Sequence, residues 1–174
     1  MSELRLFLQT FGLTELLNAH TYDSHYFNGD LKASWKFSSD TYYTAILTNL
    51  TTNYVHYLAI NIPGCDMIKS TALLPYESIN NYTDNLYTIK FAIYIQPNYI
   101  EPVIISQRTP MKNIPMDKLF IQHYKLKLAG QISFLLTGFA KKISSPRPST
   151  SPRAMIAPAS PRRSQPSANP ASAK

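Results

Sequence analysis

The clearest pattern along the chain is the alternation of apolar and polar side chains over residues 86–96, LYTIKFAIYIQ. Successive side chains of a strand point to opposite sides, so this alternation predicts a strand. Its apolar face carries Tyr87, Ile89, Phe91, Ile93 and Ile95. Residues 54–62, YVHYLAINI, predict a second strand that stops at Pro63-Gly64.

Weaker alternation predicts further strands on either side of these two. Residues 27–37, FNGDLKASWKF, have an apolar face and a basic face. The apolar face holds Leu31, Ala33, Trp35 and Phe37. Residues 70–74 fit a short strand or turn, and residues 120–137 predict one or two strands with a candidate hairpin turn at 129–131.

Two segments show helical spacing instead. Four apolar side chains near the N-terminus recur at i, i+3, i+4 and i+7, namely Leu4, Phe7, Leu8 and Phe11. They predict helical structure from residue 2 to about 19, which packs on its own domain or docks on a neighbouring copy. The four are therefore candidate self-association contacts. Ser39-Asp40 offers an N-cap before residues 41–50, TYYTAILTNL, whose apolar positions also fit one helical face.

Together these patterns predict an α+β fold. We expect mostly antiparallel sheet, an N-terminal helical segment, and one or two short helices. The predicted domain spans residues 1–143. Residues 144–174, which are rich in serine and proline and contain no Leu, Val, Phe, Tyr or Trp, predict a disordered tail, because they cannot bury enough apolar surface to offset the entropy of ordering.

Charge separates the same two regions. All 10 Asp and Glu precede residue 140, whereas the tail region contributes enough of the 17 Lys and Arg to account for the whole net charge of +7. Such an arm is typical of polyanion binding that weakens with salt. The candidate polyanion-binding residues are Lys141, Lys142, Arg147, Arg153, Arg162 and Arg163.

Three tail serines precede proline, as proline-directed kinases prefer: Ser145, Ser151 and Ser160. Each is a candidate phosphorylation site, and each phosphate would add a charge of about −1.5 to −2 at pH 7. A kinase of that class is thus a candidate partner, and the tail is a candidate regulatory element.

Catalytic and metal-binding patterns are missing from the sequence. The four histidines, His20, His25, His56 and His123, lack the tight spacing of a metal site. Cys65 is the single cysteine, which fits a reducing compartment and excludes an intrachain disulfide. No glycine-rich phosphate loop or nucleophile motif occurs. We therefore expect a non-enzymatic protein without metal or cofactor, and the sequence predicts neither a secretory signal nor a membrane span.

The order strand, helix, strand and late strand, taken over residues 27–37, 38–50, 54–62 and 86–95, resembles the matrix proteins of negative-strand RNA viruses. The similarity is greatest to the small matrix proteins of plant rhabdoviruses. This resemblance implies a viral structural protein that self-associates, condenses the viral ribonucleoprotein and links it to an anionic membrane surface. It would be found in the virion and the host cytoplasm, peripheral at membranes.

Two other functions also fit the sequence. One is a nucleic-acid-binding accessory protein, such as an RNA silencing suppressor or a movement protein, which would bind RNA duplexes through its folded body. The other is a scaffold-type interaction domain with a regulated tail.

Overall fold

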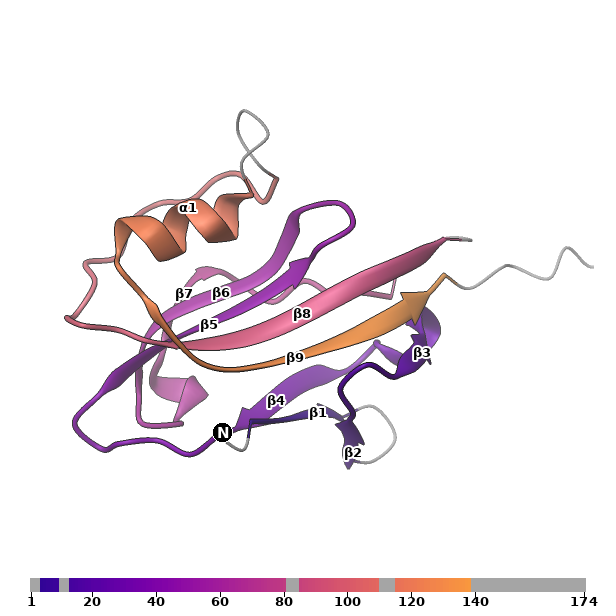
Figure 1. Cartoon of the computed structure of the whole chain (residues 1–174), viewed down its shortest axis with the longest axis horizontal. Helices are drawn as coiled ribbons and strands as arrows, with labels where there is room; N and C mark the ends of the chain where they lie inside the picture. The colour runs from indigo at the N-terminus through magenta and orange to yellow at the C-terminus, as the bar shows by residue number, and fades with distance from the viewer. Residues whose placement is uncertain (1–3, 10–12, 81–84, 110–114, 139–174) are drawn as a thin grey trace, which may run out of the picture. The chain divides into compact units, whose positions relative to one another are not determined.

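Two sheets dominate the fold in a computed structural model that describes residues 4–9, 13–80, 85–109 and 115–138 (Figure 1). The three-stranded sheet has the order β2-β1-β4 and the six-stranded sheet has the order β3-β9-β8-β5-β6-β7. The first is built from β1 (Arg5–Gln9), β2 (Leu13–Leu16) and β4 (Asp30–Ser34). The second is built from β3 (Thr21–Asp23), β5 (Tyr42–Asn49), β6 (Tyr54–Pro63), β7 (Thr71–Leu74), β8 (Leu86–Ile95) and β9 (Lys127–Thr137).

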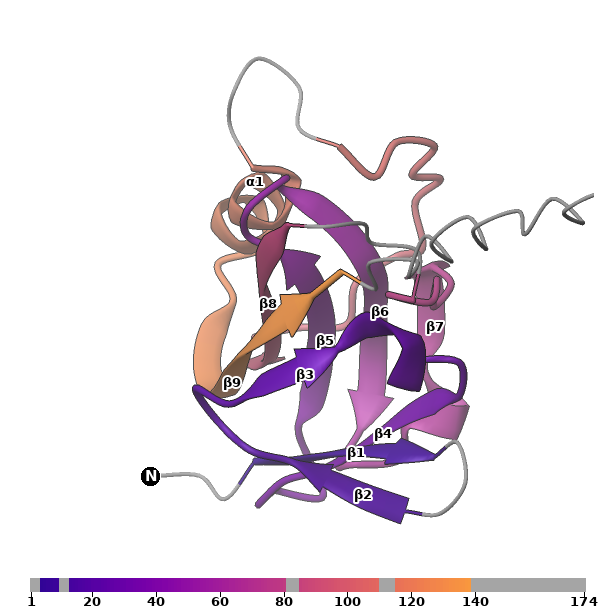
Figure 2. The same cartoon turned by 90° about the vertical axis from the view of Figure 1, so that its right-hand side faces the viewer.

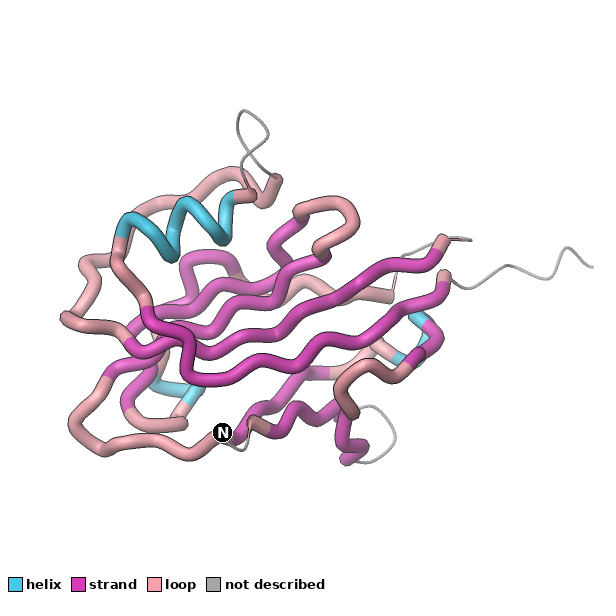
Figure 3. Tube along the Cα trace, in the orientation of Figure 1, coloured by secondary structure: helices cyan, strands magenta, loops and turns pink. Residues whose placement is uncertain are grey.

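The described part of the chain is thus mostly β, with antiparallel pairing except between β3 and β9, which run parallel. Its α-helix is the short α1 (Met116–His123), and two 3-10 turns are η1 (Ser24–Tyr26) and η2 (Met67–Lys69) (Figure 3). No helix among the described residues is both long and apolar enough to cross a membrane.

The six-stranded sheet is buried on both faces, which divides the core in two. On β5, Tyr43, Ala45 and Leu47 pack in one cluster with residues of β1 and β2, while Ile46 packs in the other with Phe120 of α1. The three-stranded sheet therefore covers one face of the central strands and α1 covers the opposite face (Figure 2).

The predicted N-terminal helix is wrong, because this segment forms β1 and β2. Leu6 and Leu8 alternate into the core between the two sheets, and Leu4 packs against the same cluster. Phe7 lies on the other side of β1, where it pairs with Lys32 of β4. The apolar positions fit a two-residue period as well as a helical one, and pairing with β4 selects the strand. Phe11 lies outside the described residues.

The helix predicted over 41–50 is also wrong. This segment is β5, which lies between β6 and β8 in the middle of the six-stranded sheet. A strand covered on both faces is apolar on both faces, so its sequence does not alternate. Its threonines and its central isoleucine favour a strand over a helix.

Other strand predictions are confirmed. The structure forms β8 and β6 where alternation and the Pro63 stop predicted them, and β7 covers most of 70–74. The strand predicted over 27–37 is shorter, because only Asp30–Ser34 pairs with β1. Trp35 is nevertheless buried, whereas Phe37 stays exposed beside Gly64.

Residues 120–137 form the end of α1 and a single strand rather than a hairpin. The predicted turn at 129–131 lies inside β9, and Ala129–Gln131 continue the ladder with β8 through a register shift. Ile132, Phe134 and Leu136 alternate along β9 and are buried.

Candidate functional site

A pocket with a cavity volume of about 480 Å³ lies between the two sheets, beside β4 and the turn that contains η2. Its inner wall consists of side chains from three buried strands, Leu6 of β1, Leu47 of β5 and Phe91 of β8. Its rim carries Asp30, Lys32 and Asp66. The pocket therefore combines an apolar interior with a charged entrance, which is the usual composition of a small-molecule site.

The strand β4 forms one side of this pocket. Leu31 and Ala33 are half-buried and pack against the core, while Asp30 and Lys32 are exposed at the entrance. Because β4 is an edge strand of the three-stranded sheet, no further strand of the described chain pairs with it on that side. The space beside this unpaired edge forms the pocket.

The turn 65–70 forms the opposite side and is fixed by its own hydrogen bonds. The Ile68 amide donates to the Asp66 carboxylate at 3.2 Å, and the Ser70 hydroxyl donates to the Met67 carbonyl at 2.7 Å. Lys69 Nζ lies 3.2 Å from the Asp66 carboxylate and lowers the pKa of that group. Ile68 itself is 95% exposed at the rim.

Two tyrosines add polar atoms to the otherwise apolar interior. Burial raises the pKa of Tyr57, and a hydrogen bond to Ser70 opposes this rise. Burial raises the pKa of Tyr76 to about 12, an effect that hydrogen bonds with the Ser78 side chain and the Ile79 backbone oppose and the charge of Asp30 reinforces.

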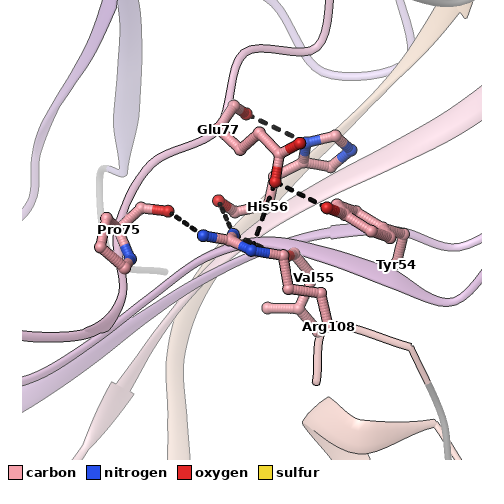
Figure 4. Close-up of polar contacts among 6 residues, drawn as sticks. All are labelled: Tyr54, Val55, His56, Pro75, Glu77 and Arg108. Atoms are coloured by element: carbon pink, nitrogen blue, oxygen red, sulfur yellow. Dashed lines mark hydrogen bonds and ion pairs between the residues drawn. The ribbon is translucent and has the colours of Figure 1, made fainter. Parts of the chain in front are cut away.

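A second polar cluster, none of whose residues lines this pocket, surrounds Arg108 (Figure 4). The guanidinium donates to the carbonyls of Val55 at 3.2 Å, His56 at 3.0 Å and Pro75 at 2.8 Å. Its Nε lies 3.2 Å from the Glu77 carboxylate. These contacts tie the segment that precedes α1 to β6 and to the segment that follows β7.

The rest of this cluster is also engaged in structural contacts. The Tyr54 hydroxyl donates to the Glu77 carboxylate at 2.6 Å, and His56 Nδ1 lies 3.0 Å from the Glu77 carbonyl. Burial lowers the pKa of His56, partly opposed by Glu77. The Arg108 guanidinium therefore contacts three carbonyls and one carboxylate of the protein. The cluster holds three segments of the chain together, and the guanidinium is not directed at an anionic ligand.

A second apolar groove, of about 540 Å³, runs between residues 103–109 and α1. Ile104 is fully exposed there, and Leu119 of α1 lies on the other side. The helix is held on the sheet by an ion pair of 3.3 Å between Lys90 of β8 and Asp117, whose side chains are 16% and 2% exposed.

Most residues singled out from the sequence do not meet at one place. The predicted tail contacts and phosphorylation sites, from Lys141 to Arg163, lie outside the described residues, so their roles stay predictions. Leu4 and Leu8 pack into the core, and the self-association role predicted for them is untested. The described residues contain no group of three or more potential metal ligands. Cys65, a free thiol, lines the pocket.

Little in the sequence indicated the pocket or Arg108. The pocket residues come from seven separated segments, and Tyr76 and Arg108 lie in stretches with no periodic pattern. The basic face of the strand predicted over 27–37, with Lys32 and Lys36, was visible, but it indicated only a solvated strand face.

Comparison with known proteins identifies the fold. No family model matches the chain, and no curated protein matches it. Among solved structures, the carboxypeptidase Y inhibitor in complex with its cognate proteinase matches with a TM-score of 0.66 at 12% identity, over 78% of this chain and 83% of the other. The fold is that of the phosphatidylethanolamine-binding proteins. Two such proteins match, from Plasmodium vivax (TM-score 0.56, 14% identity, 78% and 86% covered) and Plasmodium falciparum (0.53, 17%, 77% and 85%).

This fold overturns the resemblance to rhabdovirus matrix proteins. The functions inferred from it are wrong as well: self-assembly in a virion, condensation of ribonucleoprotein and linkage to an anionic membrane. The partner inferred from the tail serines, a proline-directed kinase, is corrected too, since the matched structure with a TM-score of 0.66 is a complex with a proteinase. The alternative of an RNA-binding accessory protein falls with them. The matched proteins are named for inhibition and for lipid binding and not for catalysis, which agrees with the expectation of a non-enzymatic protein.

Proposed function

We propose that the protein is a non-enzymatic binding protein that holds a small amphiphilic ligand of the phospholipid type in the pocket between its sheets. The observation that carries this proposal is the pocket itself, with its apolar wall of Leu6, Leu47 and Phe91 and its charged rim. The shared fold supports it, because two proteins that carry this fold are named for binding phosphatidylethanolamine.

The dimensions and chemistry of the pocket suit such a ligand. A cavity of 480 Å³ lies within the range of about 300–1,000 Å³ found for small-molecule sites. Burial of an apolar chain against the inner wall contributes about 25 cal/mol per Å² of apolar surface removed from water. At the rim, Asp30 and Lys32 carry opposite charges two residues apart on one strand, which matches a head group that carries both an ammonium and a phosphate.

Calorimetric titration of the full chain with monomeric dihexanoyl phosphatidylethanolamine tests the proposal. We expect saturable binding to the wild-type protein and loss of that binding in Ala33→Trp, because the indole fills the pocket beside β4. Ala72→Trp is the matched control, since it adds the same bulk at an exposed position of β7 outside the pocket. Absence of saturable binding to the wild-type chain, or equal binding by Ala33→Trp, contradicts the proposal.

A second candidate function is peptidase inhibition. The solved structure with a TM-score of 0.66 is an inhibitor bound to its proteinase, and the groove beside α1 exposes Ile104 and other apolar side chains as a contact surface for a protein would. Titration of carboxypeptidase Y with the full chain tests this function. Inhibition should reach completion near one equivalent and weaken in Ile104→Asp, whereas full peptidase activity at excess protein excludes it for this enzyme.

A further inference from the structure

The groove beside α1 is bordered by a segment whose backbone has no partner in the described part of the chain. Residues 101–107 have no regular secondary structure, and none of their amides or carbonyls forms a hydrogen bond with another described residue. Val103, Ile104 and Ile105 are β-branched, a residue type that favours strands. The segment therefore presents unpaired backbone groups and strand-forming side chains to a second extended chain.

The groove itself is apolar and open to solvent at this segment. Ile104 is fully exposed, and Leu119 of α1 is exposed on the opposite side of the groove. Between them, Ile105 and Phe120 pack against the core and line the groove. Exposed apolar side chains that gather around a groove, here of about 540 Å³, mark interaction sites more often than isolated exposed ones do.

Three lysines give the groove a positive border. Lys118 lies on α1, Lys125 follows that helix, and Lys127 begins β9. All three are exposed, and none forms an ion pair with another described residue. The two acidic residues of 101–127 do not balance them, because Asp117 is buried and already paired, which leaves Glu101. Acidic side chains of a partner therefore complement this border.

We propose that this groove binds an extended segment of a partner protein in which apolar and acidic side chains alternate. The segment adds to residues 103–107 as a strand, so that its apolar side chains enter the groove between Ile104 and Leu119 while its acidic side chains face the basic border. A lipid surface meets the same side chains but cannot pair with the backbone. No residue lines both this groove and the pocket between the sheets, so the inference does not depend on the proposed lipid ligand.

The test measures fluorescence anisotropy of short labelled peptides with the full chain. An alternating valine–glutamate peptide should bind saturably, and at least about tenfold more tightly than its valine–lysine counterpart, because several charge pairs change sign. Two N-methylated forms of the acidic peptide test strand pairing, one methylated at every valine amide and the other at every glutamate amide. Alternate amides of a strand point to opposite edges, so one form should lose binding and the other should keep it.

Variants of the protein locate the site. Ile104→Asp should weaken binding of the acidic peptide, whereas Leu13→Asp, at an exposed position of β2 outside the groove, should not. Lys125→Glu combined with Lys127→Glu should weaken it by roughly fivefold. Lys36→Glu is the matched control, because Lys36 is exposed and does not border the groove.

Four results would overturn this inference. The first two are equal affinity for the acidic and the basic peptide, and equal binding of the two N-methylated forms. The third is binding of phosphatidylserine vesicles without binding of any peptide, which would assign the groove to a membrane surface. The fourth is a dimer of the full chain that Ile104→Asp dissociates, which would assign the groove to a second copy. None of these results changes the titration with dihexanoyl phosphatidylethanolamine, so the proposed function is judged separately.

Discussion

Arg108 shows how a single side chain can fix parts of the fold that have no regular structure. Its guanidinium donates to three carbonyls and pairs with Glu77, and its own carbonyl accepts from the Val55 amide at 2.8 Å. Charge-assisted hydrogen bonds of this kind are stronger than neutral ones, and a planar fork places several of them at once.

We expect Arg108→Ala to lower the free energy of unfolding by about 2–4 kcal/mol, because it removes three charge-assisted hydrogen bonds to carbonyls and the ion pair with Glu77. Arg108→Lys should recover only part of this loss, since an ammonium cannot reproduce the fork. Urea unfolding measures both. Arg5→Ala is the control: its ion pair with Glu15 is exposed and spans 3.8 Å, so its loss should change stability by less than about 0.5 kcal/mol. If Arg108→Ala changes stability by as little as Arg5→Ala, Arg108 does not hold these segments together.

His56 should make stability depend on pH. Burial lowers its folded-state pKa below the ordinary value of 6.5, so at acidic pH the unfolded chain binds the proton more readily. Its contribution is therefore fully present above pH 6.5 and is lost as pH falls through 6.5 towards the folded-state pKa, at no more than about 1.4 kcal/mol per pH unit. Urea midpoints at pH 7.5 and 5.5 should fall further apart in the wild type than in His56→Gln. If the two urea midpoints differ by the same amount in both proteins, groups other than His56 cause the loss of stability at acidic pH.

At the scale of elements, the attachment of α1 depends on the ion pair between Lys90 and Asp117. Removal of one partner leaves a buried charge unpaired, so Lys90→Met should destabilise the protein by about 3 kcal/mol. Lys90→Met combined with Asp117→Leu should recover most of the loss, because no charge then remains buried. Equilibrium unfolding of the single and the double variant measures both effects. If the double variant loses more free energy of unfolding than Lys90→Met alone, the account is contradicted.

The sequence predicted β8 and β6 because each is a single run with a clear end, at Pro97 and Pro63 respectively. It failed for β5 and β1 for two physical reasons. Both faces of β5 are buried, so the two-residue period is absent from its sequence. The strand β1 is short, and its apolar side chains fit two periods at once until pairing with β4 decides between them. A local sequence pattern does not reveal non-local contacts of this kind.

The sequence indicated even less about the pocket than about these strands, for the same reason. Leu6 and Phe91 are 85 residues apart in sequence, and only the stacking of the two sheets brings them to one wall. The sequence did show charged residues on β4, but not that they border a cavity.

At the scale of the whole molecule, order of strands along the chain proved a poor guide to function. The order strand, helix, strand and late strand on which the resemblance to matrix proteins rested is not the order of this fold, because Tyr42–Asn49 form the central strand β5 and not a helix.

The division of the chain into residues 1–143 and 144–174 remains a prediction. A chain that ends at Ile143 should keep the urea midpoint and the ligand affinity of the full chain, because the tail lacks the apolar side chains of a core. The same truncation should abolish retention on a heparin column at low salt, if the tail cations bind polyanions. A lower midpoint would show that the tail contributes to the fold, and unchanged retention would assign polyanion binding to the body.

The most direct measurement of the central claim is a crystal structure of the full chain grown with dihexanoyl phosphatidylethanolamine. The account predicts acyl-chain density between β4 and the wall formed by Leu47 and Phe91, with the head group beside Asp30 and Lys32 at the rim. Ligand density at another surface, with this pocket closed by its own side chains, would contradict the account.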